Sequence, residues 1–217
     1  MESMKTKQHL RKESKGSWDK YIAAEVEWWQ KTFFGSRQMA LSAHNDFFQL
    51  IYDRYCKFLH GKSFPRALEI GTGASGGFLC VLSNIKQKYS LDIISDELDK
   101  IGMLPFKNKI NYLNGRAEKM PFDNEDFDLV IISNTLDHCE DMNKVVSEIK
   151  RVLKPGAYVL FVTYLNVSQP HPHTFKTDKE ARRIWAGMRL MEYHVVINNS
   201  RFRKRNNYYV AIFQKYD

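Results

Sequence analysis

Three glycines follow a short apolar run with the spacing of a nucleotide-binding turn. Residues 67–70 read as the end of a strand, Gly71, Gly73 and Gly76 follow it, and a helix-compatible segment comes next. Glycine lets backbone N–H groups approach a ligand closely where a side chain would collide. The pattern therefore predicts a strand-turn-helix unit that binds a nucleotide, and by itself it leaves open which nucleotide.

An acidic residue at the end of the next expected strand fits two kinds of ligand. Asp92 lies 21 residues after Gly71, where a dinucleotide fold places its ribose-binding acid. S-adenosylmethionine also contains an adenosine, so its binding requires the same kind of acceptor. We expect the two carboxylate oxygens of Asp92 to accept hydrogen bonds from the ribose hydroxyls, with Ile93 flanking the adenine.

Glu69 favours S-adenosylmethionine over a dinucleotide. It lies two residues before Gly71 in a run that is otherwise apolar, where dinucleotide folds usually keep a hydrophobic residue. A carboxylate there suits the amino and sulfonium groups of S-adenosylmethionine, so Glu69, Gly71 and Gly73 are expected to face the methionine end. The chain also ends early for a separate dehydrogenase substrate domain, which makes a nicotinamide oxidoreductase the least favoured alternative.

Several further motifs follow in a recognisable order. Their residues are 68–73 (Leu-Glu-Ile-Gly-Thr-Gly), 91–95, 117–122, 127–130, 134–140 and 151–156 (Arg-Val-Leu-Lys-Pro-Gly). Together they resemble the class I S-adenosylmethionine-dependent methyltransferases that act on small molecules, over roughly half of the chain. The resemblance implies S-adenosylmethionine as cofactor and S-adenosylhomocysteine as product. It also implies that Ala117 and Glu118 contact the adenine edge and that Asn134 lies over the cofactor, while Arg116 stands where relatives often carry Asp.

The order of expected elements predicts an α/β fold with a Rossmann-like, doubly wound sheet. After Pro65, strand and helix patterns alternate, which is typical of a mostly parallel sheet. Strands are expected at 66–70, 89–94, 110–113, 127–133, 156–163, 192–198 and 207–214, and helices at 76–87, 96–103, 141–153 and 177–187. The last two strands, joined by a basic turn, are expected to form the antiparallel end of a seven-stranded sheet.

The residues before this sheet divide into two segments. Residues 1–16 have no apolar period and predict a disordered basic tail, whereas 17–62 predict two helices separated near Ser36, a plausible helix cap. We expect the helices to form a lid or substrate segment on a methyltransferase domain at 63–217. Trp28 and Trp29 in the first helix are expected either to line an aromatic pocket or only to anchor the helix.

Histidines mark the side where an acceptor would bind. His138 follows Asp137 after the fourth strand, and a histidine near its ordinary pKa can take a proton from a hydroxyl or amine. A structural role for His138 is the alternative, because methyl transfer requires mainly alignment. His171 and His173, between and after two prolines, are expected to contact substrate. No third ligand accompanies them, so no metal site is predicted.

Composition limits the classes of protein that fit. The chain has 217 residues, three widely spaced cysteines and no apolar run long enough for a membrane span, which predicts a cytoplasmic protein with reduced thiols. The net charge of +8 comes largely from residues 5–15 and 201–205. These clusters leave nucleic acid open as a partner but do not favour it, because a solvated tail and a charged hairpin tip explain them better.

We expect transfer of a methyl group to a small-molecule acceptor, with oxygen favoured over nitrogen or carbon, by a monomer or homodimer. An RNA or protein methyltransferase that uses the basic surface is the nearest alternative. A non-catalytic S-adenosylmethionine-binding protein is the alternative from a different class.

Overall fold

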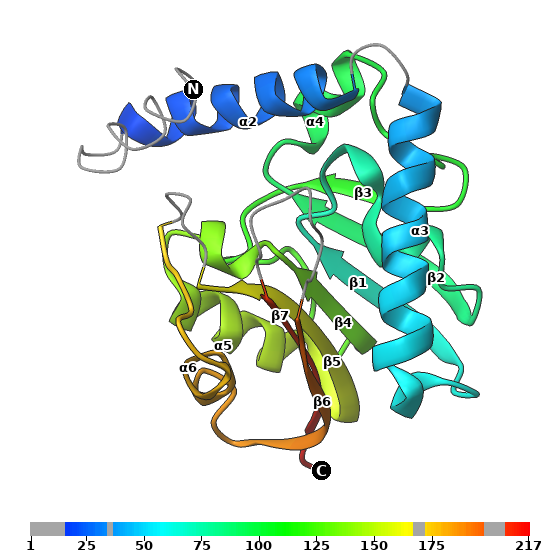
Figure 1. The fold of residues 1–217 in the computed structure, drawn as a ribbon, viewed down its shortest axis with the longest axis vertical. Helices are drawn as coiled ribbons and strands as arrows, with labels where there is room; N and C mark the ends of the chain where they lie inside the picture. Colours follow the sequence, from blue (N-terminus) through cyan, green and yellow to red (C-terminus); the bar gives the residue numbers. More distant parts are fainter. Residues whose placement is uncertain (1–15, 34–36, 167–171, 198–206) are drawn as a thin grey trace.

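The computed structural model describes residues 16–33, 37–166, 172–197 and 207–217 (Figure 1). Within them lies a seven-stranded sheet in the order β3-β2-β1-β4-β5-β7-β6. Strands β1 to β5 pair in parallel, whereas β7 is antiparallel to both β5 and β6. The strands are β1 Phe64–Ile70, β2 Ile85–Asp92, β3 Asn111–Asn114, β4 Phe127–Ser133, β5 Leu153–Leu165, β6 Met188–Val196 and β7 Asn207–Lys215. The predicted doubly wound sheet is confirmed.

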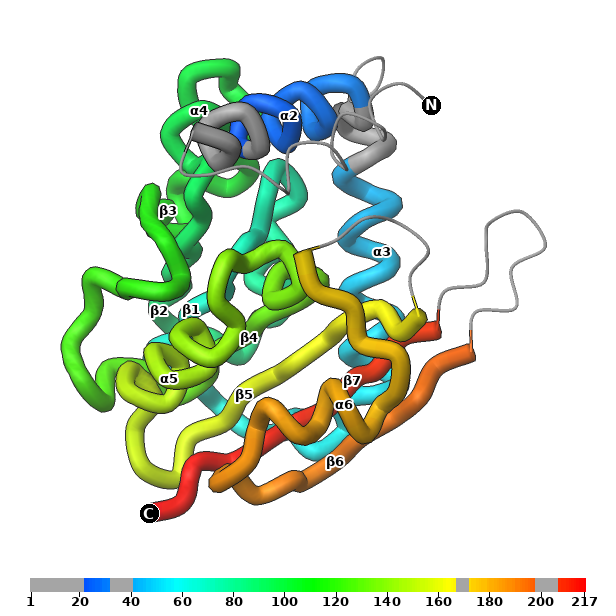
Figure 2. Tube along the Cα trace, turned by 90° about the vertical axis from the view of Figure 1, so that its left-hand side faces the viewer, coloured from blue at the N-terminus to red at the C-terminus, as the bar shows by residue number. Residues whose placement is uncertain are grey.

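Helices cover both faces of this sheet and the end toward which its parallel strands run. The helices are α2 Gly16–Phe33, α3 Arg37–Tyr55, α4 Ser95–Lys100, α5 Met142–Val152 and α6 Asp178–Arg183. Phe48 and Ile51 of α3 pack in the core on one face, and residues of α5 and α6 pack in the core on the other (Figure 2). Helix α2 lies across the end of the molecule toward which the parallel strands run (Figure 1).

Helix α5 illustrates how local sequence produces these elements. Val145, Val146, Ile149 and Val152 recur at helical spacing and form its buried stripe. Asp141 caps the helix, since its carboxylate accepts hydrogen bonds from the backbone N–H groups of Asn143 and Lys144. The helix ends at Val152, and β5 begins at the next residue, three residues earlier than predicted. The pairing of β5 with β4 has an irregular register between Phe127 and Leu129.

The predicted helix at 76–87 is wrong. A single 3₁₀ turn, η4 Gly77–Cys80, lies within these residues before β2 begins at Ile85, and another, η3 Gly73–Ser75, directly precedes them. Gly76 and Gly77 both have left-handed backbone conformations, with φ of 73° and 61°, and such residues cannot continue a right-handed helix. The ammonium of Lys88 donates to the carbonyls of Leu79 and Leu82 at 2.6 Å each. These contacts replace hydrogen bonds that a helix would have supplied.

Some sequence-based expectations fall on residues that the structure does not describe. These are the basic tail at 1–15, the cap at Ser36, the histidine at 171 and the basic cluster at 201–205. In the part of the chain that is described, no helix has the length and apolarity needed to span a bilayer.

Candidate cofactor site

The glycine turn after β1 is built so that other elements lie directly on its backbone. Gly71 and Gly73 have φ of 74° and 53°, a region that residues with a side chain rarely adopt. A Cβ at Gly71 would overlap the Thr135 side chain, and one at Gly73 would overlap the Trp29 indole ring. Both positions therefore require glycine for conformation and for space.

Asp92 at the end of β2 holds this turn in place. Its Oδ2 accepts a hydrogen bond from the N–H of Gly73 at 2.8 Å, and its Oδ1 accepts one from the N–H of Ile94 at 3.1 Å. Burial raises the pKa of the Asp92 carboxyl, opposed by these N–H groups and reinforced by the charge of Glu25. Because each carboxylate oxygen has two lone pairs, Asp92 can still accept hydrogen bonds from a ribose. Its ribose-binding role stays a prediction, as does the adenine contact of the half-buried Ile93.

Glu69 of β1 is fully engaged with the segment that follows the turn. Its side chain is buried, and its two oxygens accept hydrogen bonds from the N–H groups of Phe78 and Leu79 at 3.1 and 2.9 Å. Burial raises the pKa of Glu69 to about 8, against the effect of these N–H groups and of Lys88. Glu69 thus orders the backbone that directly follows the glycine turn. Its expected attraction for a cationic ligand stays a prediction.

The end of β4 lies beside the glycine turn. Thr135 Oγ1 is 3.2 Å from the Gly71 carbonyl oxygen and donates to this oxygen or to that of Ser133. Asn134 adopts a left-handed conformation with φ of 49°. Its Oδ1 is buried and has no hydrogen-bond partner among the described residues. A buried acceptor without a donor is costly, so Asn134 fits a position that a bound ligand would complete.

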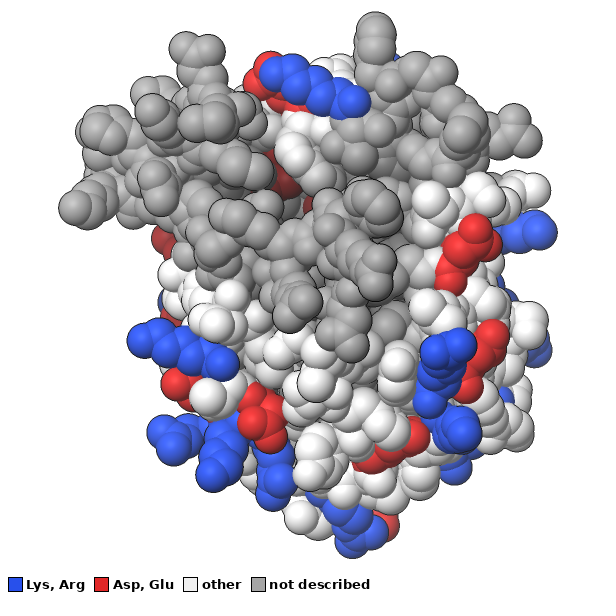
Figure 3. Space-filling model, viewed as in Figure 1, with Lys and Arg blue, Asp and Glu red and all other residues white. Residues whose placement is uncertain are grey.

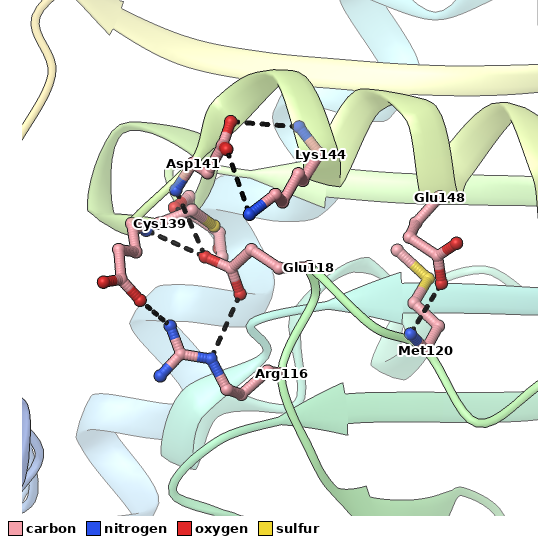
Figure 4. Close-up of polar contacts among 9 residues, drawn as sticks. Arg116, Glu118, Met120, Cys139, Asp141, Lys144 and Glu148 are labelled. Carbon is pink, nitrogen blue, oxygen red and sulfur yellow. Dashed lines mark hydrogen bonds and ion pairs between the residues drawn. The ribbon is translucent and has the colours of Figure 1, made fainter.

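Glu118 connects the segment after β3 to the start of α5 (Figure 4). Its Oε1 accepts a hydrogen bond from the N–H of Glu140 at 2.8 Å, and its Oε2 lies 3.5 Å from Nε of Arg116. Arg116, the residue that departs from the family pattern, also pairs with the Glu140 carboxylate. Ala117 beside them is buried. The contact of Ala117 and Glu118 with adenine stays a prediction. Glu118 is held in place by its contacts with Glu140 and Arg116.

His138 lies between two carboxylates, those of Glu25 and Asp137. Its Nδ1 is 3.9 Å from Oε1 of Glu25 in α2, and its Nε2 is 3.9 Å from Oδ2 of the buried Asp137. The N–H of His173 donates to the Asp137 carbonyl at 3.1 Å, which brings the loop after β5 to the same place. The Nε2 atom of His173 is buried without a hydrogen-bond partner in the described chain. The predicted residues Asp137, His138 and His173 thus lie together.

Sequence reasoning missed Glu25. It lies in α2 among Ile22, Val26 and Trp29, which pack against the cluster of Ala74, Ile94 and Leu98. A charged residue inside the apolar stripe of a helix was the available signal, because such a residue must find a partner when the stripe is buried.

The two tryptophans of α2 differ in their surroundings. Trp29 packs against Gly73 and the apolar cluster, whereas Trp28 is 43% exposed and meets the Trp29 ring edge-on at 5.0 Å. Trp29 therefore anchors the helix and lies on the glycine turn at the same time. No cluster of three or more His, Cys, Asp or Glu side chains suited to a metal ion occurs among the residues described.

Comparison with known proteins identifies this arrangement. Residues 68–161 match a family model described as a methyltransferase domain. Over these residues the chain resembles a class I methyltransferase domain. Its matched residues include the glycine turn, Asp92, Asn134 and His138, and S-adenosylmethionine is the cofactor of this class.

Relatives of this methyltransferase domain act on different acceptors, according to their names. A malonyl-[acyl-carrier protein] O-methyltransferase of Marinomonas sp. is 26% identical over 74% of the chain and 57% of its own length. A demethylmenaquinone methyltransferase of Chlorobaculum tepidum is 35% identical over 48% of the chain and 43% of its own length. The chain thus spans about half of these relatives.

Solved structures share the fold of this chain. The N-methyltransferase NodS of Bradyrhizobium japonicum, in complex with S-adenosylhomocysteine, has a TM-score of 0.62 over 89% of this chain and 99% of its own, at 14% identity. A methyltransferase of Methanosarcina mazei has a TM-score of 0.58 over 74% of this chain and 96% of its own, at 19% identity.

Proposed function

We propose that this chain transfers a methyl group from S-adenosylmethionine to a small-molecule acceptor, with oxygen as the favoured acceptor atom. The observation that carries the proposal is the meeting of three strand ends: the glycine turn held by Asp92, the partnerless Asn134 oxygen and the His138 ring flanked by carboxylates. In open parallel sheets, ligands bind outside the carboxyl ends of the strands.

The residues present fit S-adenosylmethionine. When bound, it would supply a reactive methyl group on a positively charged sulfur. Transfer of that methyl group to the acceptor would break the carbon–sulfur bond and leave S-adenosylhomocysteine. Gly71 and Gly73 provide backbone that a ligand can approach, and Asp92 provides free lone pairs for the ribose. The buried Oδ1 of Asn134 can accept a hydrogen bond from the ligand. Ile93 and Ala117 supply apolar contacts for the adenine.

The protein's own contribution to the transfer is alignment and proton removal. Fixing an acceptor in line can contribute up to ~7–11 kcal/mol. Helix α2 and the loop near His173 cover the site, so we propose that they form a lid that excludes water. His138 then takes the proton of an acceptor hydroxyl, with the neighbouring Asp137 stabilising the charged ring, a step that can add ~10²–10⁴-fold.

The carboxylates gathered at the strand ends support a small acceptor. On the face in Figure 3, the described Lys and Arg side chains away from α2 lie interspersed with Asp and Glu side chains. The side chains that meet at the strand ends include the carboxylates of Glu25, Asp92 and Asp137. Such a site does not favour a polyanion such as RNA.

Calorimetric titration with S-adenosylmethionine, S-adenosylhomocysteine and NAD tests the proposal. We expect the two sulfur nucleotides to bind and NAD to fail. Asp92→Ala should weaken binding by at least ~100-fold, because two hydrogen bonds to a charged group are each worth about 1.5 kcal/mol or more. Asp123→Ala, at an exposed position on the same domain, should bind like wild type. Preference for NAD, or equal loss in both variants, would contradict the proposal.

Acceptor screening separates an enzyme from a non-catalytic binding protein. We expect turnover of S-adenosylmethionine with hydroxyl-bearing small molecules. Once an acceptor is found, His138→Ala should lower the rate by ~10²-fold or more if proton removal limits it. A rate within a few-fold of wild type would remove His138 as the base, and tight cofactor binding without any acceptor would favour the binding protein.

A further inference from the structure

We propose that Glu25 is a positioning residue for His138: its carboxylate orients the ring from the Nδ1 side and stabilises the imidazolium that forms when the ring takes the acceptor's proton. The inference rests on the proposed function, because it assigns a partner to the proposed base. Glu25 lies in α2, outside the residues that match the methyltransferase family.

The position of Glu25 in α2 is the first argument. Ile22, Val26 and Trp29 form the apolar stripe that packs against Ala74, Ile94 and Leu98, and Glu25 lies within this stripe. Its side chain is only 17% exposed, in contrast to the 59% of Glu27 on the same helix. A carboxylate removed from water to this extent needs polar or charged partners. The His138 ring is such a partner.

The geometry around His138 is the second argument. Oε1 of Glu25 lies 3.9 Å from Nδ1, and Oδ2 of Asp137 lies 3.9 Å from Nε2. Both distances exceed a hydrogen bond, as is common for catalytic pairs before substrate binds. These carboxylates are the charged groups that contact the ring within the described residues. The side chain of Asp137 is only 3% exposed, so Glu25, on the covering helix, is the partner that can move closer.

The role of Glu25 follows from the chemistry of imidazole. A carboxylate near each ring nitrogen favours the doubly protonated imidazolium over the neutral ring. The neutral ring therefore takes the proton of a hydroxyl more readily. The resulting imidazolium is stabilised by the charge of Glu25, while the hydroxyl oxygen becomes the stronger nucleophile.

Because Glu25 belongs to α2, its contact with His138 depends on the position of that helix. Trp29, one turn further along α2, lies on Gly73, so the same helix covers the glycine turn and brings the carboxylate to His138. His138 therefore has this partner only when α2 is docked on the domain. The geometry couples proton removal to closure of the site.

The titration of His138, followed by NMR of the ring nitrogens and carbon-bound protons, tests the proposal without any acceptor. The signal is assigned among the seven histidines with a His138→Gln variant. We expect Glu25→Gln to lower the midpoint by at least ~0.5 pH unit, because a nearby negative charge stabilises the imidazolium. Glu27→Gln on the exposed face of α2 is the matched control and should leave the midpoint unchanged.

The conservative variant Glu25→Asp separates charge from packing. It keeps the carboxylate, so it should retain most of the wild-type midpoint. A Glu25→Asp shift as large as that of Glu25→Gln would assign the effect to helix packing and overturn the proposal. An unchanged midpoint in Glu25→Gln, with unchanged thermal unfolding, would also overturn it. A shift together with absent S-adenosylmethionine binding would instead refute the proposed function and leave the residue pair standing.

Discussion

The indole ring of Trp29 lies against the backbone of Gly73, so α2 and the glycine turn form one continuous surface. The two residues are far apart in the chain and belong to segments with different predicted roles. Any ligand that binds over the glycine turn must contact Trp29 or displace it. This relationship makes the tryptophan a natural reporter of the site.

Intrinsic fluorescence should detect cofactor binding through Trp29. We expect S-adenosylhomocysteine to change the tryptophan emission of the wild type, because the ligand alters the surroundings of the ring on Gly73. Trp29→Phe should lose most of this change. The exposed neighbour provides the control, since Trp28→Phe should retain it. An unaltered response in Trp29→Phe would mean that the ring does not lie at the ligand site.

Glu69 should make stability fall as pH rises through neutrality. Burial raises its pKa in the folded state from 4.5 to about 8, so between these values the folded state binds a proton that the unfolded chain lacks. Stability is therefore greatest below the unfolded pKa and is lost as pH rises toward 8, at up to about 1.4 kcal/mol per pH unit. Urea unfolding at several pH values should give a shallower dependence in Glu69→Gln. Parallel curves for the two proteins would show that Glu69 does not titrate there.

Lys88 should stabilise the irregular segment between the turn and β2. Replacing it by Met leaves the carbonyls of Leu79 and Leu82 without their donor, at an expected cost of ~1–3 kcal/mol. Urea unfolding measures this loss. Lys86→Met, at an exposed position on the same strand, should stay within ~0.5 kcal/mol of wild type. Equal effects at both positions would indicate a general effect of charge.

The three cysteines should be unreactive in the folded protein. Burial raises the thiol pKa of Cys56, Cys80 and Cys139, that of Cys80 to about 12. Since only the thiolate reacts, Ellman's reagent at pH 8 should modify the native protein more than ~100-fold more slowly than the urea-unfolded chain. Peptide mapping would identify an exception. Rapid native labelling of any of the three would show that its segment opens readily.

The sequence by itself determined the elements whose causes are local. Short apolar runs between helical patterns placed the seven strands, because parallel strands covered on both faces read as nearly continuous apolar runs. The spacing of Gly71, Gly73 and Asp92 placed the nucleotide turn, because such a turn requires glycine conformations and a nearby acid. These features depend on residues close together in the chain.

The tertiary structure decided what depends on contacts between distant segments. It replaced a predicted helix at 76–87 by one 3₁₀ turn and the start of β2, because Glu69 and Lys88 bind the backbone there from neighbouring strands. It also inserted β7 between β5 and β6. Most importantly, it brought Glu25 to His138, residues with no local relation in the sequence. Docking of α2 on the sheet creates that pair, and helical periodicity alone states only which face of α2 is buried.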